Sequence, residues 1–216
     1  MRIAAVLLLS LPAAHASAQE SLETKLVITQ AGRETGREEF TLRRGRGRGA
    51  PGSTLIAVAR YPATNPLLKL AADLERNPEA ALAKFQLDVE GPNGTTVILA
   101  AGSGARLIVR TVAKGSEAGR ELPGGPDVVL LDEDVYSLYT AVVDLATPAG
   151  KPLTGVFPRA SRRASFVARR EGGGGNGADR VTLSGDINGT LVADRSGRLQ
   201  RLEFPGSGIL VTRAQD

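Results

Sequence analysis

Cysteine and histidine, the side chains that most often serve as nucleophiles, general bases or metal ligands, are nearly absent from this chain. It has no Cys, and its one His is His15, close to the N-terminus. The lack of Cys excludes thiolate chemistry, disulfides and every Cys-ligated metal site. Removal of residues 1–18 would also exclude histidine general bases, His-ligated metals and Ser-His-Asp catalysis.

Carboxylates are the remaining candidates for chemistry. Asp127, Asp132, Glu133 and Asp134 lie close together in the sequence and could bind a hard cation such as Ca²⁺. Their spacing is not that of an EF-hand loop, and capping of a following helix accounts for these acids without a metal. We therefore predict no metal site.

Two further patterns are weak indicators of an enzyme. Residues 47–52 and 172–177 match G-x-G-x-x-G, but neither segment opens a helix within a βαβ unit, as a dinucleotide site requires. Asp186 and Asp194 could form a glycosidase pair, yet the sequence fixes no distance between them. We predict that the protein is not an enzyme, with no catalytic residues and no cofactor, and we rank a carboxylate hydrolase third among the functions considered.

Arginines form the strongest local charge run, at Arg43, Arg44, Arg46 and Arg48. A solvated hairpin loop explains the run most simply; an anionic surface or an envelope protein is the functional alternative. The whole chain has a net charge of +4, and its basic residues are interspersed with acids. We therefore predict no nucleic-acid partner.

The N-terminal segment has the order of a secretory signal peptide. A positive start is followed by an apolar run over residues 3–11 and by an A-x-A pattern at residues 16–18. We predict cleavage after Ala18, which gives a periplasmic or secreted protein with residues 19–216 as a single β-rich domain. No stretch approaches the roughly eighteen apolar residues of a membrane-spanning helix, so we predict no transmembrane segment in the mature chain.

Short apolar runs separated by Gly, Asn, Asp and Pro clusters predict strands along most of the chain. Residues 67–75 fit a helical stripe and a strand face equally well, and their neighbours favour the strand. One segment, residues 132–146, predicts a helix. Its apolar residues recur at helical spacing, Asp132 or Asp134 could cap it, and Pro148 follows its end. We predict a mainly β fold: one antiparallel open β-barrel of about ten to twelve strands wrapped around this helix.

Three short motifs resemble those of a group of uncharacterised exported bacterial proteins with a β-rich domain of unknown function. They are GRETGREEF at residues 32–40, DEDVYSLY at residues 132–139 and DRSGRLQRL at residues 194–202. Such proteins look like open barrels around a helix and resemble the periplasmic lipoprotein-carrier fold. The resemblance implies an apolar concavity able to shelter acyl chains.

We expect an exported envelope protein that binds or carries an apolar or lipid-like ligand. Candidate residues for lining the pocket are the following, although plain core packing would use the same residue types: Phe40, Phe85, Leu87, Tyr136, Tyr139 and Phe166. The alternative is a structural or interaction protein of the envelope without a small-molecule ligand. It would meet its partner through an exposed strand edge or through the arginine run.

Overall fold

The computed structural model describes residues 21–45, 52–174 and 178–214. The predicted signal peptide, Arg46 and Arg48 lie outside the described residues, as does part of each glycine-rich segment. The description below concerns the described residues alone.

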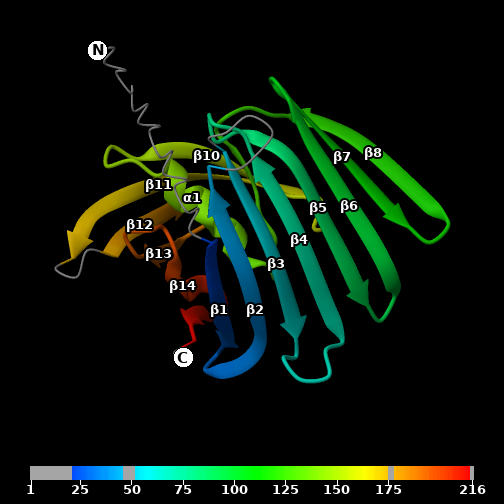
Figure 1. Ribbon diagram of the computed structural model, residues 1–216, viewed down its shortest axis with the longest axis horizontal. Coiled ribbons are helices and arrows are strands. Elements are labelled where there is room, and N and C mark those ends of the chain that lie inside the picture. Colours follow the sequence, from blue (N-terminus) through cyan, green and yellow to red (C-terminus); the bar gives the residue numbers. More distant parts are fainter. Residues whose placement is uncertain (1–20, 46–51, 175–177, 215–216) are drawn as a thin grey trace, which may run out of the picture.

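These residues form one curled sheet of fifteen strands that surrounds a short helical segment (Figure 1). Consecutive strands pair with each other, except that β8 and β9 lie at opposite edges of the sheet; at its centre β1 pairs with β15. The bounds of the strands are β1 Ser21–Gln30, β2 Arg33–Arg44, β3 Ser53–Tyr61, β4 Leu68–Arg76, β5 Leu82–Gly91, β6 Gly94–Ser103, β7 Arg106–Ala113, β8 Ser116–Pro123, β9 Val128–Leu130, β10 Lys151–Phe157, β11 Arg162–Gly174, β12 Ala178–Gly185, β13 Gly189–Ala193, β14 Leu199–Phe204 and β15 Ile209–Arg213.

The sheet is open, because its two edge strands, β8 and β9, do not pair with each other. All its pairings are antiparallel apart from β9 with β10, which run parallel. The predicted class, an open antiparallel β structure curled around one helix, is therefore confirmed. The number of strands exceeds the predicted ten to twelve, because short segments such as β9, with three residues, also join the sheet.

The uncertain segment at residues 67–75 is a strand, as favoured. In β4 every second side chain faces inward, so that Leu70, Ala72 and Leu74 are buried. Leu67 lies just before the strand and is 71% exposed. The strand face therefore explains the burial, and the helical stripe does not.

The helical segment is shorter than residues 132–146. It consists of a 3-10 turn, η1 (Tyr136–Tyr139), followed by one short α-helix, α1 (Thr140–Leu145). Residues of both pieces are buried inside the curl of the sheet, with Leu138 and Val142 fully enclosed. Small side chains on the inner face of β3 (Ala57, Ala59) and of β11 (Ala168) leave room where the helical segment approaches those strands.

Neither predicted capping residue caps this helix. The 3-10 turn begins after Val135, which provides no side-chain cap, and the preceding Asp132 and Asp134 lie in a non-helical loop. Asp132 instead accepts a hydrogen bond from the backbone N–H of Asp134 at 2.9 Å. The cap comes from Glu38 on β2, far away in the sequence. Because this cap comes from a distant strand, the sequence next to the helix carries no sign of it. The local acids Asp132 and Asp134 therefore look like caps in the sequence, and the predicted helix begins too early.

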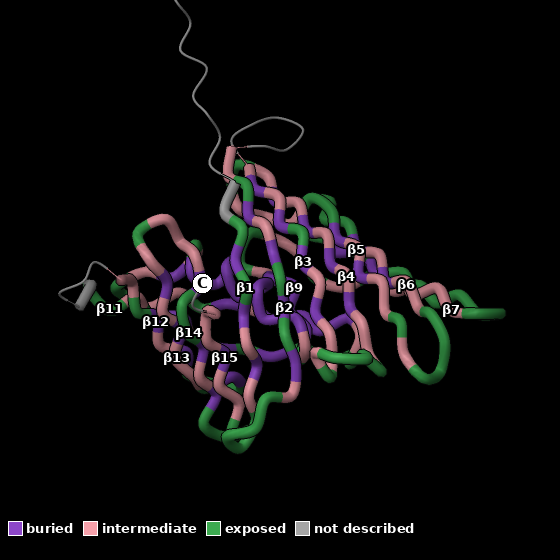
Figure 2. The backbone as a smooth tube through the Cα atoms, turned by 60° about the horizontal axis from the view of Figure 1, so that its bottom comes forward, coloured by how far each residue is buried: buried purple, intermediate pink, exposed green. Residues whose placement is uncertain are grey.

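The interior of the curl is filled with side chains. Figure 2 shows buried positions alternating with more exposed ones along the strands, and the buried side chains form a single core cluster with the helical segment. A ligand site therefore has to be sought where the core meets solvent at an end of the strands.

Candidate functional site

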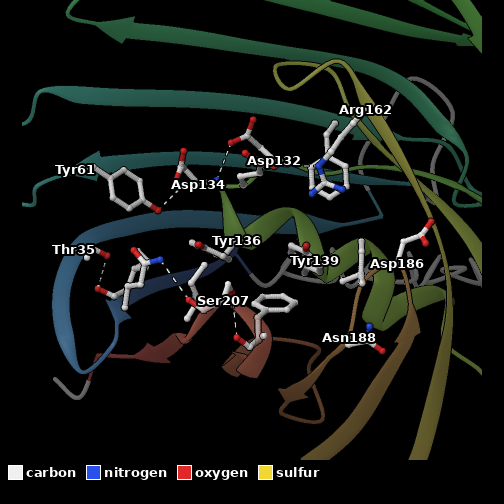
Figure 3. Close-up of a pocket in the computed structure, with 18 residues that line it drawn as sticks. Thr35, Tyr61, Asp132, Asp134, Tyr136, Tyr139, Arg162, Asp186, Asn188 and Ser207 are labelled. Carbon is white, nitrogen blue, oxygen red and sulfur yellow. Dashed lines mark hydrogen bonds and ion pairs between the residues drawn. The ribbon is translucent and has the colours of Figure 1, made fainter.

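A pocket with a volume of about 560 Å³ lies at one end of the sheet (Figure 3). Its walls come from the ends of β1, β3, β10 and β14 and from the starts of β2, β11 and β15, which meet at the same end because neighbouring strands are antiparallel. The turn between β12 and β13, the 3-10 turn η2 (Pro205–Ser207) and η1 complete it. We call it the mouth pocket. Its lining residues are Ile28, Gln30, Thr35, Tyr61, Asp132, Glu133, Asp134, Tyr136, Tyr139, Phe157, Arg162, Asp186, Ile187, Asn188, Phe204, Gly206, Ser207 and Ile209.

Three aromatic rings form the floor of the mouth pocket. Tyr136 and Tyr139 project from η1 (Figure 3), and both rings contact that of Phe204 at the end of β14. The ring centroid of Phe204 is 6.3 Å from that of Tyr136 and 5.2 Å from that of Tyr139, with tilted planes. Both distances fall within the range of about 4.5–7 Å over which the rings of aromatic pairs attract each other.

Two glycines make room for aromatic rings of this pocket. A Cβ on Gly189 would lie 2.7 Å from a ring atom of Phe204, and a Cβ on Gly36 would lie 2.3 Å from ring atoms of Tyr61. A larger residue at either position would force the adjacent ring to move. Both glycines thus belong to the construction of the site and do more than permit a turn.

Glu38 holds the helical segment in place behind the floor. Its fully buried carboxylate accepts hydrogen bonds from the backbone N–H groups of Tyr136 at 2.7 Å and Ser137 at 3.0 Å. Burial raises the pKa of Glu38 to about 7, although these hydrogen bonds lower it. This contact fixes where η1 starts and so where Tyr136 and Tyr139 point.

Arg159 holds the loop before η1. Its guanidinium group donates to both oxygens of Asp132, at 2.7 and 2.9 Å, and also to Asp134. Tyr61 donates its hydroxyl to the backbone oxygen of Asp134 at 2.8 Å. The paired carboxylates raise the pKa of Arg159, so this cation is permanent. The loop is therefore fixed from β3 and from the segment between β10 and β11.

The rim of the mouth pocket carries charge of both signs. Glu133 accepts from Arg162 at 3.1 Å, and the guanidinium carbon of Arg162 lies 3.6 Å from the ring centroid of Phe157. Asp186, in the turn after β12, accepts from the backbone N–H of Ser165 at 2.8 Å. Among the described lining residues, four are acidic and Arg162 alone is basic.

The two tyrosines of the floor keep unused hydrogen-bonding capacity. Tyr136 is 4% exposed and Tyr139 is 5% exposed, yet neither hydroxyl makes a hydrogen bond to any described residue. Burial raises the pKa of both hydroxyls, so they stay protonated at neutral pH. Each can donate one hydrogen bond and accept another from a bound molecule.

The structure brings only two of the predicted pocket residues together. Tyr136 and Tyr139 line the mouth pocket, whereas Phe40, Phe85, Leu87 and Phe166 are buried in the core and do not line it. Sequence reasoning missed Phe204, at the end of β14, and Ile187, in the turn between β12 and β13; both are far from Tyr136 and Tyr139 in the sequence. The signal in the sequence that could have found the site is Gly36 and Gly189, because a glycine within a strand often marks a position that another group approaches closely.

The other candidates from the sequence have structural partners. Asp127 pairs with Lys151, and no group of three or more His, Cys, Asp or Glu side chains within the described ranges could hold a metal. Asp194 accepts from the backbone N–H groups of Ser196 and Arg198 in the turn before β14. It does not line the mouth pocket with Asp186, so the structure does not assemble the two as a pair there.

The arginine run is described only at its start. Arg43 is exposed on β2. Arg44 donates to Asp144 at the end of α1 and to the backbone oxygen of Ser196 at 3.0 Å. Arg44 thus serves the packing of α1 at the end of the sheet opposite the mouth pocket.

A second pocket, of about 320 Å³, lies beside the connection between β8 and β9. Leu82, Leu107 and Val128 line it together with the glycines Gly102 and Gly124. It is smaller than the mouth pocket, and few polar side chains point to a particular ligand there.

No helix in the described part of the chain is long and apolar enough to cross a membrane. Comparison of the chain with protein-family models, with curated proteins and with solved structures finds no match.

Proposed function

We propose that this chain is an exported, non-enzymatic envelope protein that binds an apolar or lipid-like ligand in the mouth pocket. One observation carries the proposal: a preformed pocket of about 560 Å³ whose floor is aromatic and whose walls include Ile28, Ile187 and Ile209. Pockets that bind small molecules typically measure about 300–1,000 Å³ and combine an apolar lining with a few polar groups. The mouth pocket has that size and that lining.

The position of the pocket refines what the fold resemblance implies. A carrier of the open-barrel type would shelter an acyl chain inside the concavity, but here the helical segment fills the curl. The apolar part of the ligand would therefore lie across Tyr136, Tyr139 and Phe204, at the end of the curl, with its other end in solvent.

Two features of the sequence support export and the absence of catalysis. The pattern over residues 1–18 has the order of a cleavable signal peptide. The chain lacks Cys, and Asp132, Glu133 and Asp134 in the mouth pocket are each paired with an arginine, which is typical of structural carboxylates.

A direct test is native mass spectrometry of the protein purified without detergent from the compartment to which it is exported. We expect an adduct of lipid mass that is lost on denaturation. A bare protein of the mass of residues 19–216 would argue against a retained ligand, and recovery of residues 1–216 uncleaved would argue against export.

A filled-pocket variant tests the location. Ile187 is 7% exposed and lines the mouth pocket, so Ile187→Trp places a large ring in the space that the ligand would occupy. Binding of an apolar naphthylamine probe can be followed by the enhancement of its fluorescence. We expect the apparent affinity for this probe to fall at least about tenfold in the variant, because the new ring overlaps the space that the probe would occupy. The matched control is Ile56→Trp, on the outer face of β3, where Ile56 is 49% exposed; it should bind as the wild type does. Equal probe binding by both variants would place the ligand elsewhere.

One observation favours the alternative, an interaction protein of the envelope. The edge strand β8 pairs only with β7, and most of its side chains are exposed, so its free backbone groups could accept a strand from a partner. The dependence of binding on salt concentration distinguishes attachment through arginines such as Arg43 from binding of an apolar ligand. Attachment through arginines should weaken steeply from low to physiological ionic strength, whereas binding of an apolar probe should change little.

A further inference from the structure

The mouth pocket is electronegative. Asp132, Glu133, Asp134 and Asp186 contribute four carboxylates, while Arg159 and Arg162 contribute the two guanidinium groups that pair with them. Asp132 and Asp134 share the single cation of Arg159. Asp186 has only a backbone N–H as partner, and no basic side chain of the described chain forms an ion pair with it. An excess of negative charge therefore remains beside the aromatic floor.

The aromatic floor also suits a cation. The face of an aromatic ring attracts positive charge, most strongly where water is excluded. The pocket already contains one such contact, since the guanidinium group of Arg162 lies 3.6 Å from the centroid of Phe157. The rings of Tyr136, Tyr139 and Phe204 lie in the same pocket.

The unpartnered hydroxyls point independently to a ligand. Tyr136 and Tyr139 are more than nine-tenths buried, line the pocket, and have no hydrogen-bond partner among the described residues (Figure 3). The two hydroxyl oxygens themselves remain accessible from the pocket, so each can exchange a water molecule for a polar group of a ligand. Phenol oxygens can accept hydrogen bonds from an ammonium group, and the neighbouring carboxylates favour the same charge.

We propose that the ligand of the mouth pocket is an amphiphile with a cationic ammonium head group, and that the pocket discriminates against anionic amphiphiles. This inference rests on the proposed function, because it assigns the head group of the apolar ligand. The positively charged head lies between Asp186 and the tyrosine hydroxyls, and the apolar body lies against Phe204 and Ile209. An anionic head would meet the excess carboxylates, and the one basic residue of the lining, Arg162, is already paired with Glu133.

The test is isothermal titration of the intact mature protein with dodecyl amphiphiles below their micelle concentrations. The probes are dodecylammonium, dodecyltrimethylammonium, neutral dodecyl maltoside and dodecyl sulfate. We expect both cationic probes to bind at least about tenfold more tightly than dodecyl sulfate, with the neutral probe between them. The preference should shrink as salt is added, because screening weakens charge–charge attraction.

One substitution assigns the preference to the pocket. Asp186→Asn removes a charge but keeps an oxygen that can accept from Ser165. We expect it to weaken the two cationic probes several-fold and to leave the neutral probe unchanged. The matched control is Glu117→Gln on β8, which removes an exposed carboxylate far from the pocket and should leave all four affinities unchanged. Unchanged neutral binding also shows that the variant remains folded.

The outcomes separate the inference from the proposed function. Equal affinity for cationic, neutral and anionic probes would overturn the inference and leave an apolar pocket standing. A cation preference that Asp186→Asn does not reduce would overturn the assignment to this pocket. Failure of every probe to bind would overturn the proposed function, and the inference with it.

Discussion

At the scale of single residues, Glu38 links the sheet to the pocket. It is a fully buried carboxyl group on β2, it caps η1, and it interacts electrostatically with Tyr61 and with Asp132 of the loop before η1. Burial raises its pKa from 4.5 to about 7, so the folded protein retains a proton that the unfolded chain releases in this range. The contribution of Glu38 to the free energy of unfolding is fully present below pH 4.5 and is lost as the pH rises through 7.

We therefore predict that the free energy of unfolding falls by about 2 kcal/mol between pH 5 and pH 8. The described residues include no histidine, so no other described group ordinarily titrates in this interval. In Glu38→Gln, which cannot titrate, most of this fall should disappear. Urea unfolding at the two pH values measures the effect, and a fall of equal size in wild type and variant would show that Glu38 is not its source.

At the scale of elements, α1 depends on side chains from three strands. Asp144 near its end pairs with Arg44 of β2 and with Arg76 of β4, whose side chain is buried. Arg170 of β11 donates to the backbone oxygens of Val143 and Ala146, which the end of the helix leaves without intrahelical partners. A helix this short would not be stable alone in water. The contacts with β2, β4 and β11 therefore provide the stabilisation that its few intrahelical hydrogen bonds cannot.

Asp144→Ala should therefore be strongly destabilising. It leaves the buried guanidinium group of Arg76 without its carboxylate, and we expect a loss of about 2–3 kcal/mol, somewhat below a fully buried pair because Asp144 is partly exposed. Glu203→Ala on β14 is the matched control, because it removes an exposed partner of Arg201 and should cost less than about 1 kcal/mol. Thermal or urea unfolding compares the two, and similar losses would show that Asp144 is an ordinary surface pair.

These elements also show how far sequence reasoning reaches. Strands such as β3 and β4 were predictable because alternation of apolar residues records one buried face. The start of η1 was not predictable, because its cap comes from Glu38, a residue distant in the sequence. For the same reason the sequence indicated Tyr136 and Tyr139 but not Phe204 or Ile187, which reach the mouth pocket only through the topology of the sheet.

At the scale of the whole molecule, the sheet consists of two meanders, β1–β8 and β9–β15, joined by the pairing of β1 with β15. Ile28 lies opposite Val211, and the backbone N–H of Ala214 donates to the oxygen of Lys25 at 2.8 Å. The two ends of the described chain are therefore close together, whereas the gap in the sheet falls between β8 and β9, which are consecutive in sequence.

This arrangement predicts that the chain tolerates circular permutation. Joining residues 214 and 21 by a short linker and opening the chain at Gly125, between β8 and β9, would make every strand pair a neighbour in sequence. Folding rates rise as contacts become more local, so we expect the permutant to fold faster than the original chain at similar stability. Stopped-flow refolding measures this, with a permutant opened at Asn93 in the β5–β6 turn as the control; equal rates would contradict the prediction.

The pairing of β1 with β15 also sets the order in which the protein can be completed. Of the fifteen strands, β1 is synthesised first, but one of its edges has to wait for β15, the last. During that interval one edge of β1 has backbone N–H and C=O groups without partners. Leu26 and Ile28, which are buried in the folded protein, lie on the same strand. Until β15 is synthesised, this unpaired edge can pair with strands of other chains, and a chaperone that bound the edge during that interval would prevent such aggregation.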